Sequence, residues 1–448
     1  MKRVISLVLS LCLLIFAVPA MASNAPVELT MWTLFSGEDG STMNQIVENF
    51  NNSQTEVHLN HVVIDYTNLM TKIALAAGDD AACPHLFVSY ASDIAYLADA
   101  GRIQPMDEIF AAYPEFDFSL ERYNPACEVL NMYQEHRYAV TLDFPSEGMY
   151  VNMELANQYC PEVLEDNVVT WDEIKSIGAK LKADGVEDVK VLTAEWALND
   201  MIQVYLLYAD TWSSEDAQTL ELDKQAMING INTWKECYDA GYLWEEGDDC
   251  AAMFANGEAI FFTGGNWCMN AVKQYGFDFR FIAAPQLDPE NVVLYGDAHS
   301  FMKPTRTYTD AELRGLGQWI AYFYENSLDW AQAGSLIAAS EPRESEEFAA
   351  LPQAFVANSY EPYNPVYKYN SIFSKTISDF DWQAVYGHIS AEDYATCLQV
   401  LVEKAQQNSG SVNTITGEIV VIDPYANHIG VRLDKEQAPE YSSVYGID

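Results

Sequence analysis

The chain has 448 residues, of which 66 are acidic and 23 basic, so its formal net charge at pH 7 is −43. This balance argues against a nucleic-acid partner, because phosphate recognition needs clustered Lys and Arg. It also opposes anionic ligands and anionic membrane surfaces. The length exceeds that of a single hydrophobic core, so we expect two domains.

The N-terminus has the pattern of a secretory signal. Two basic residues precede an apolar run over residues 4–18, and residues 20–22 form a small-x-small cleavage site. The run is shorter than the roughly 18 residues of a membrane-spanning helix, and the helix breaker Pro19 follows it. We therefore expect residues 1–22 to be removed and the product to be exported, either to a periplasm or to the cell exterior.

The chain has 8 cysteines. Cys12 lies within the signal and follows Leu11 where a lipoprotein signal has a small residue, so no lipid anchor is expected. The odd number that remains requires a free thiol or an intermolecular bond, and the closest pair, Cys237 and Cys250, is the best candidate for a disulfide. The sequence has no Cys-x-x-Cys or paired-His motif, so we expect no metal and no cofactor.

Strand-like and helix-like segments alternate from the start of the exported chain. Residues 29–34, 58–64 and 85–89 have the pattern of strands, with helices expected around residues 43–50 and 69–77. This order predicts parallel strands joined by helical crossovers, which is an α/β layered domain.

A second series of elements follows near residue 138. Strands are expected at residues 149–153, 188–192 and 258–262. Residues 170–173 and 309–312 are capping boxes, in which a Thr hydroxyl and a Glu carboxylate each satisfy an amide in the first turn of a helix. The sequence thus predicts α/β architecture in both halves.

Several short segments occur in an order that is typical of one family. They are residues 29–32 with 36–38, residues 66–79, 148–153, 170–173 and 254–270. Together, across residues 28–345, they resemble the extracellular solute-binding proteins of carbohydrate ABC importers, the maltose-binding-protein-like group. The sequence departs from that family at His85, where an acidic residue is usual, and at Asn266, where a small or hydroxyl residue is commoner.

The resemblance implies a two-lobed periplasmic-binding-protein-like fold of type II, with a ligand cleft between the lobes. The first lobe would contain residues 23–140 and 289–335, and the second residues 141–288 and 336–448. The implied partners are a sugar or oligosaccharide and the permease subunits of an ABC transporter. A monomer without catalytic residues is expected.

A sugar site needs aromatic planes against the C–H faces of the ring and polar groups at its hydroxyl edge. Trp267 follows two glycines at a strand end, and Gly265 lets backbone amides come close to a ligand. Glu38 and Asp39 lie in the first loop after a strand, where they would accept hydrogen bonds from neighbouring hydroxyls. These four residues are our first candidates for ligand contact.

Three further aromatic residues follow strands, namely Tyr66, Tyr90 and Trp196, and His299 follows a strand-like run. Strand ends in α/β sheets line ligand crevices, so we expect these residues at the cleft too. The alternative for each aromatic residue is packing on the rim of its own lobe, and for His299 it is a hydrogen-bonded place in the core.

Three other functions are compatible with the sequence. The same fold could bind a polyamine or another cation, which suits the acidic charge. A secreted glycoside hydrolase would need two carboxylates flanking one bond, and no hydrolase elbow, zinc motif or phosphate loop points to other chemistry. A surface protein without a transport partner is the third alternative.

Overall fold

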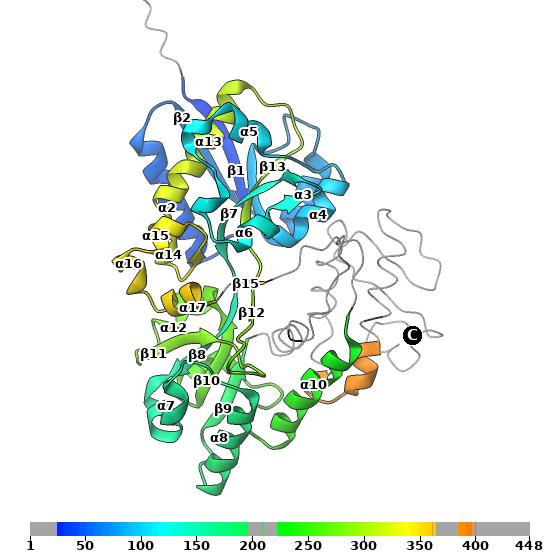
Figure 1. Ribbon diagram of the computed structural model, residues 1–448, viewed down its shortest axis with the longest axis vertical. Coiled ribbons are helices and arrows are strands. Elements are labelled where there is room, and N and C mark those ends of the chain that lie inside the picture. The colour runs from blue at the N-terminus through cyan, green and yellow to red at the C-terminus, as the bar shows by residue number, and fades with distance from the viewer. Residues whose placement is uncertain are drawn as a thin grey trace, which may run out of the picture.

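The computed structural model describes residues 25–195, 208, 222–360, 362–363, 384–396 and 399, and the structural statements below concern those residues. Figure 1 shows two α/β lobes stacked along the long axis of the molecule, with β12 (Leu294–Tyr295) and β15 (Pro362–Tyr363) at the junction between them. Each lobe has its own sheet, covered by helices.

The larger sheet has seven strands in the order β14-β7-β13-β3-β1-β2, with β4 paired to β13. Strand β1 runs parallel to β2 and β3, and β13 runs antiparallel to β3 and β7. The strands are β1 (Val27–Thr33), β2 (Val57–Val63), β3 (Leu86–Tyr90), β4 (Ile103–Gln104), β7 (Ala139–Phe144), β13 (His299–Pro304) and β14 (Leu336–Ile337).

Helices pack on this sheet through the apolar stripes that the sequence predicts. Met43, Ile46 and Phe50 of α2 are at most 2% exposed, and the capping box of Thr309 and Glu312 begins α13. The helices of this lobe are α2 (Glu38–Ser53), α3 (Tyr66–Ala76), α4 (Ile94–Asp99), α5 (Asp107–Ala112), α6 (Ala126–Leu130), α13 (Asp310–Glu325) and α14 (Ser327–Ala331); a hairpin adds β5 (Met132–Tyr133) and β6 (His136–Arg137).

In the described part of the chain, the smaller sheet has four strands in the order β11-β8-β10-β9. Strand β10 is parallel to β9 and antiparallel to β8. The strands are β8 (Glu147–Asn152), β9 (Lys190–Ala194), β10 (Ala259–Gly265) and β11 (Phe279–Ala283). The helices are α7 (Met153–Tyr159), α8 (Trp171–Ala183), α10 (Lys224–Asp239), α11 (Cys250–Ala255) and α12 (Met269–Val272), and the second predicted capping box begins α8.

Two chain segments that join the lobes lie side by side. Between β7 and β8, Ser146 forms a β-bridge with Gly296, and the amide of Asp297 donates to the carbonyl of Pro145 at 3.0 Å. After β14 the chain continues through α15 (Ser340–Arg343), α16 (Glu346–Ala349) and α17 (Ala354–Ser359) to β15, which pairs with β12. The end of each sheet nearest these segments therefore faces the other lobe.

The predicted disulfide between Cys237 and Cys250 is wrong, because both residues are free thiols. Cys237 lies on α10 and is fully buried in the core of the smaller lobe, whereas Cys250 is the first residue of α11. Closeness in sequence did not place the two side chains together. Among the described helices, none is both long and apolar enough to cross a membrane.

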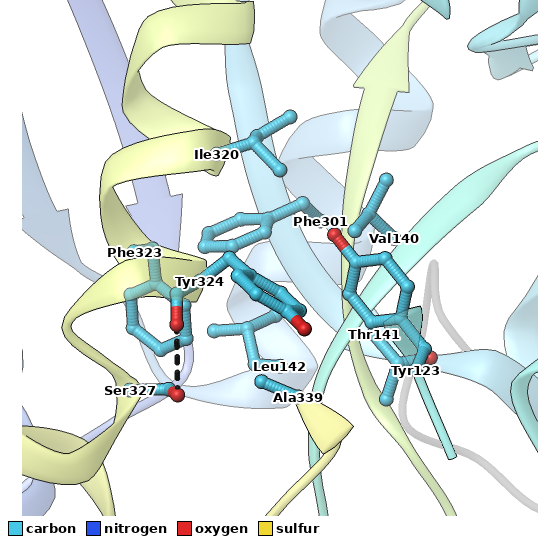
Figure 2. Close-up of a pocket in the computed structure, with 10 residues that line it drawn as sticks. All are labelled: Tyr123, Val140, Thr141, Leu142, Phe301, Ile320, Phe323, Tyr324, Ser327 and Ala339. Atoms are coloured by element: carbon cyan, nitrogen blue, oxygen red, sulfur yellow. Dashed lines mark hydrogen bonds between the residues drawn. The ribbon is translucent and has the colours of Figure 1, made fainter. Parts of the chain in front are cut away.

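The larger lobe contains a small cavity of about 10 Å³ (Figure 2). It lies between α13 and strands β7 and β13, and Ser327 Oγ donates to the carbonyl of Tyr324 at 2.9 Å beside it. Its lining is mostly aliphatic and aromatic, and its volume is about that of one water molecule. This cavity is too small for a solute, so the candidate site lies elsewhere.

Candidate ligand-binding site where the lobes meet

The larger lobe presents a row of aromatic rings at the ends of its strands. Tyr66 begins α3, Tyr90 ends β3 and His299 begins β13. The ring centroids of Tyr66 and Tyr90 are 5.2 Å apart, those of Tyr90 and His299 are 5.1 Å apart, and those of His299 and Phe35 are 5.0 Å apart. The structure thus brings three of the predicted site residues into one contiguous cluster of rings, which the buried Phe35 extends.

Asp93 fixes the Tyr66 end of this row. Its buried carboxylate accepts hydrogen bonds from the Tyr66 hydroxyl at 3.0 Å and from Ser89 Oγ at 2.6 Å. Hydrogen bonds to an ionised carboxylate are among the stronger ones in proteins. The turn after β3, which carries Asp93, therefore sets the orientation of the Tyr66 ring.

Asp143 fixes the opposite end. Its carboxylate, 2% exposed, accepts from His299 Nδ1 at 2.8 Å and from Trp330 Nε1 at 2.9 Å. Nδ1 therefore carries the proton, and this orients the imidazole. Within the described residues, His299 Nε2 is buried without a hydrogen-bond partner.

Asp297 lies on the same segment as His299, two residues before it. It accepts from Ser92 Oγ at 2.5 Å and from the amide of Ala298 at 2.7 Å. Burial raises the pKa of the Asp297 carboxyl above its ordinary value, although these hydrogen bonds oppose the shift. Desolvation disfavours the charged form of an acid, so protonation of this side chain is easier here than in water.

Four carboxylates lie near the Tyr90 hydroxyl. Burial raises the pKa of Tyr90, and Asp297, Asp93, Asp143 and Glu147 raise it further by repelling a phenolate. The phenol stays a neutral donor and acceptor at any physiological pH. The Tyr90 hydroxyl therefore lies in the negative field of these carboxylates.

The smaller lobe contributes Trp267. Strand β10 ends at Gly265, and the 3-10 turn Asn266–Cys268 follows at once. Trp267 is partly exposed, and its Nε1 donates to Glu195 Oε2 at 3.0 Å. Cys268 Sγ contacts the same oxygen at 3.0 Å. Glu195 directly follows β9, so the ends of two adjacent strands hold the indole in place.

Close packing explains why residues 264 and 265, just before the Trp267 turn, are glycines. A β-carbon on Gly265 would lie 2.1 Å from two ring carbons of Trp267, so the indole folds back over the strand end. At Gly264, a β-carbon would lie 3.1 Å from the Phe262 ring and 3.3 Å from Cys268 Sγ. Gly265 therefore makes room for the indole, and its contact with a ligand remains a prediction.

Glu38 and Asp39 do not lie in a loop as expected, because α2 begins at Glu38. Both residues lie in the first turn of this helix. Their role in ligand binding remains a prediction. Trp196 lies outside the described residues.

The sequence analysis missed Asp93, Asp143, Glu195 and Asp297. A usable signal was present, since Asp143 and Glu195 stand at or just after apolar strand-like runs, where an ionised side chain requires a specific partner. Within the described ranges, no group of His, Cys, Asp and Glu has the arrangement of a metal site.

Residues 45–356 match the model of the family described as bacterial extracellular solute-binding protein. The chain belongs to this family. The predicted family is confirmed, and with it the expectation of a protein that binds a solute outside the cytoplasm.

Solved structures of similar fold cover most of the chain. The GacH receptor of Streptomyces glaucescens, solved unliganded and with acarbose, has a TM-score of 0.70 and 14% identity over 86% of this chain and 100% of its own. The sugar-binding protein MalE of Xanthomonas citri has a TM-score of 0.71 and 14% identity over 85% and 98%. The maltodextrin-binding domain of Bdellovibrio bacteriovorus, bound to maltotriose, has a TM-score of 0.67 and 15% identity over 85% and 100%. These likenesses confirm the two-lobed α/β fold.

Proposed function

We propose that the protein captures a sugar or oligosaccharide between its lobes and delivers it to the permease of an ABC importer. The observation that carries the proposal is the pairing of an aromatic row, Tyr66–Tyr90–His299, on one lobe with the carboxylate-bound indole of Trp267 on the other. Similar structures were solved with acarbose, maltotriose or maltose bound, which supports the same class of ligand here.

The chemistry of these side chains suits a pyranose. Flat rings cover the C–H faces of a sugar, and the carboxylates near Tyr90 and at Glu195 accept hydrogen bonds from its hydroxyls. Binding without cleavage is proposed, so that no residue is catalytic. The exported protein would act as a monomer in a periplasm or at the cell exterior, without a lipid anchor.

Closure of the lobes provides the mechanism. An open form admits the sugar, and closure buries it and creates the shape that a permease recognises. We propose the discontinuous lobes expected from the sequence, with the crossings moved to the segments that join the two sheets. These are residues 145–146, residues 284–298 and the chain after Ile337, since β7 and β14 pair within the larger sheet.

A cationic solute such as a polyamine is the second candidate. The four carboxylates whose charges raise the pKa of Tyr90 favour it, because a protonated amine is attracted to negative charge. Competition between a neutral saccharide and spermidine separates the two candidates.

The test is a thermal-shift screen of the exported chain with maltose, maltotriose, cellobiose, xylotriose and spermidine. A ligand present at 100 times its Kd stabilises the folded protein by about 2.7 kcal/mol. We expect a saccharide to raise Tm and to change tryptophan emission, and we expect Trp267→Ala to abolish both effects. Trp32→Phe, on β1 of the other lobe, is the control and should respond like the parent.

Three outcomes would contradict the proposal or favour another function. No shift with any saccharide, together with identical behaviour of parent and Trp267→Ala, contradicts the proposal. A shift with spermidine alone supports the cationic solute. Chromatography of the incubated saccharide detects cleavage products, and their appearance would identify a hydrolase.

A further inference from the structure

The turn that carries Trp267 also contacts the larger lobe. Asn266, the residue before Trp267, is 3% exposed, and its Nδ2 donates to the carbonyl of Gly334 at 3.2 Å. Gly334 lies between α14 and β14, and β14 pairs with β7 in the larger sheet. This hydrogen bond therefore joins the two lobes one residue away from the proposed ligand contact.

Asn266 also holds the segment that connects the lobes. Its Oδ1 accepts from the amide of Ser146 at 2.8 Å, and its own amide donates to the carbonyl of Ser146 at 3.1 Å. Ser146 lies between β7 of the larger sheet and β8 of the smaller sheet. One buried side chain thus binds the connecting segment and the other lobe at the same time.

Close packing reinforces this contact. Gly334 has a φ of +103°, and a β-carbon there would lie 2.7 Å from the carbonyl oxygen of Asn266 and 2.5 Å from Met269 Cβ. The backbone at residue 334 can come this close to the Trp267 turn only because glycine has no side chain. Nearby, Lys273 Nζ donates to the carbonyl of Gln332 at 3.1 Å on the surface.

We propose that Asn266 is a positioning residue that couples the Trp267 turn to the angle between the lobes. The inference rests on the proposed function, in that Trp267 is taken to touch the ligand. Any change of the lobe angle must move Gly334 relative to the turn, and Asn266 transmits that movement to the indole. In the same way, an indole fixed by a ligand holds the lobes in one arrangement.

The amide of Asn266 is suited to this role because it is donor and acceptor at once. Asn266→Asp is nearly isosteric and keeps an acceptor for the Ser146 amide. It loses the donor to Gly334, and a carboxylate oxygen then faces the Gly334 carbonyl. The variant therefore breaks the bond between the lobes while the bond to the connecting segment is kept.

Asn270→Asp is the matched control. Asn270 lies four residues further on, in α12, so the substitution adds the same charge to the same part of the lobe. Small-angle X-ray scattering of the ligand-free proteins measures the distribution of distances between the lobes. We expect a broader distribution for Asn266→Asp than for the parent, and no change for Asn270→Asp.

Binding is measured with the first saccharide of the screen that raises the Tm of the parent. We expect Asn266→Asp to bind about tenfold more weakly, within the range of coupling between two sites, chiefly through faster dissociation. Its ligand-induced compaction and its change in Trp267 emission should both be smaller than those of Asn270→Asp.

Unchanged ligand-free scattering and unchanged dissociation in Asn266→Asp would overturn the inference. If the variant does not fold, Asn266→Ser keeps a hydroxyl acceptor for Ser146 and is measured in its place. If no saccharide binds the parent, the proposed function fails. The ligand-free scattering then still decides whether Asn266 ties the lobes together.

Discussion

The indole of Trp267 occupies the space in which a side chain at Gly265 would begin, since a β-carbon at residue 265 would lie 2.1 Å from its ring. The indole is held there by Glu195, which accepts its N–H at 3.0 Å. The end of β10, the missing side chain at Gly265 and the carboxylate of Glu195 together fix one orientation of the indole ring. Each of these three features can be tested separately.

Gly265→Ala should displace the indole and weaken saccharide binding nearly as much as Trp267→Ala does. An overlap of this size forces the ring away from Glu195, because packed interiors absorb added methyl groups poorly. Titration calorimetry measures the affinity. In the Trp267→Ala background the same glycine substitution should change nothing further. A Gly265→Ala protein with the affinity of the parent would contradict this account.

Glu195→Ala should weaken saccharide binding about 10- to 100-fold, because a hydrogen bond to a charged group contributes about 1.5–3 kcal/mol. The loss of the acceptor frees both the indole and the Cys268 thiol. Glu258→Ala is the control, since this exposed carboxylate precedes the opposite end of β10. Equal affinities of the two variants would show that Glu195 does not orient the site.

Asp143→Asn should lower the free energy of unfolding by about 1–3 kcal/mol. The Asp143 carboxylate accepts from both His299 and Trp330, whereas an amide offers one acceptor oxygen and turns a donor toward the other N–H. The midpoint of urea unfolding measures the change. Asp329→Asn, at an exposed position of α14, should leave the midpoint unaltered, and equal midpoints for both variants would be inconsistent with a buried network.

His61 should make stability depend on pH. Burial lowers its pKa to about 4, and the neutral ring fits its surroundings, with Nδ1–H donating to Asn44 Oδ1 at 2.7 Å and Nε2 accepting from Thr33 Oγ1 at 2.6 Å. Its contribution is present above the unfolded-state pKa of about 6.5. It is lost as the pH falls from there toward about 4.

His61→Gln isolates this contribution from the many carboxylates that titrate in acid. The free energy of unfolding is measured for both proteins between pH 8 and pH 4. We expect the difference in the free energy of unfolding between parent and His61→Gln to become smaller as the pH falls from 6.5 toward about 4. A difference that stays constant would mean that the imidazole is not held neutral by the fold.

The order of elements was available from the sequence because it follows from local rules. Apolar spacing placed α2, capping boxes placed the starts of α8 and α13, and short apolar runs placed β1 and β10. Trp267 was likewise available as a candidate for ligand contact, since it lies two residues after the end of a strand. The start of α2 was not predicted, because the helix begins at Glu38, within the expected loop.

Only the tertiary structure decided which side chains form the hydrogen bonds that hold the site residues in place. Glu195 and Trp267 are 72 residues apart in sequence, Asp143 and Trp330 are 187 apart, and Asn266 and Gly334 are 68 apart. No local pattern relates such pairs, because a hydrogen bond depends on where separate strands end in space. The sequence alone determined which segments form strands and helices and which family they resemble, while the packing of the two sheets determined which carboxylates, rings and amides meet between them.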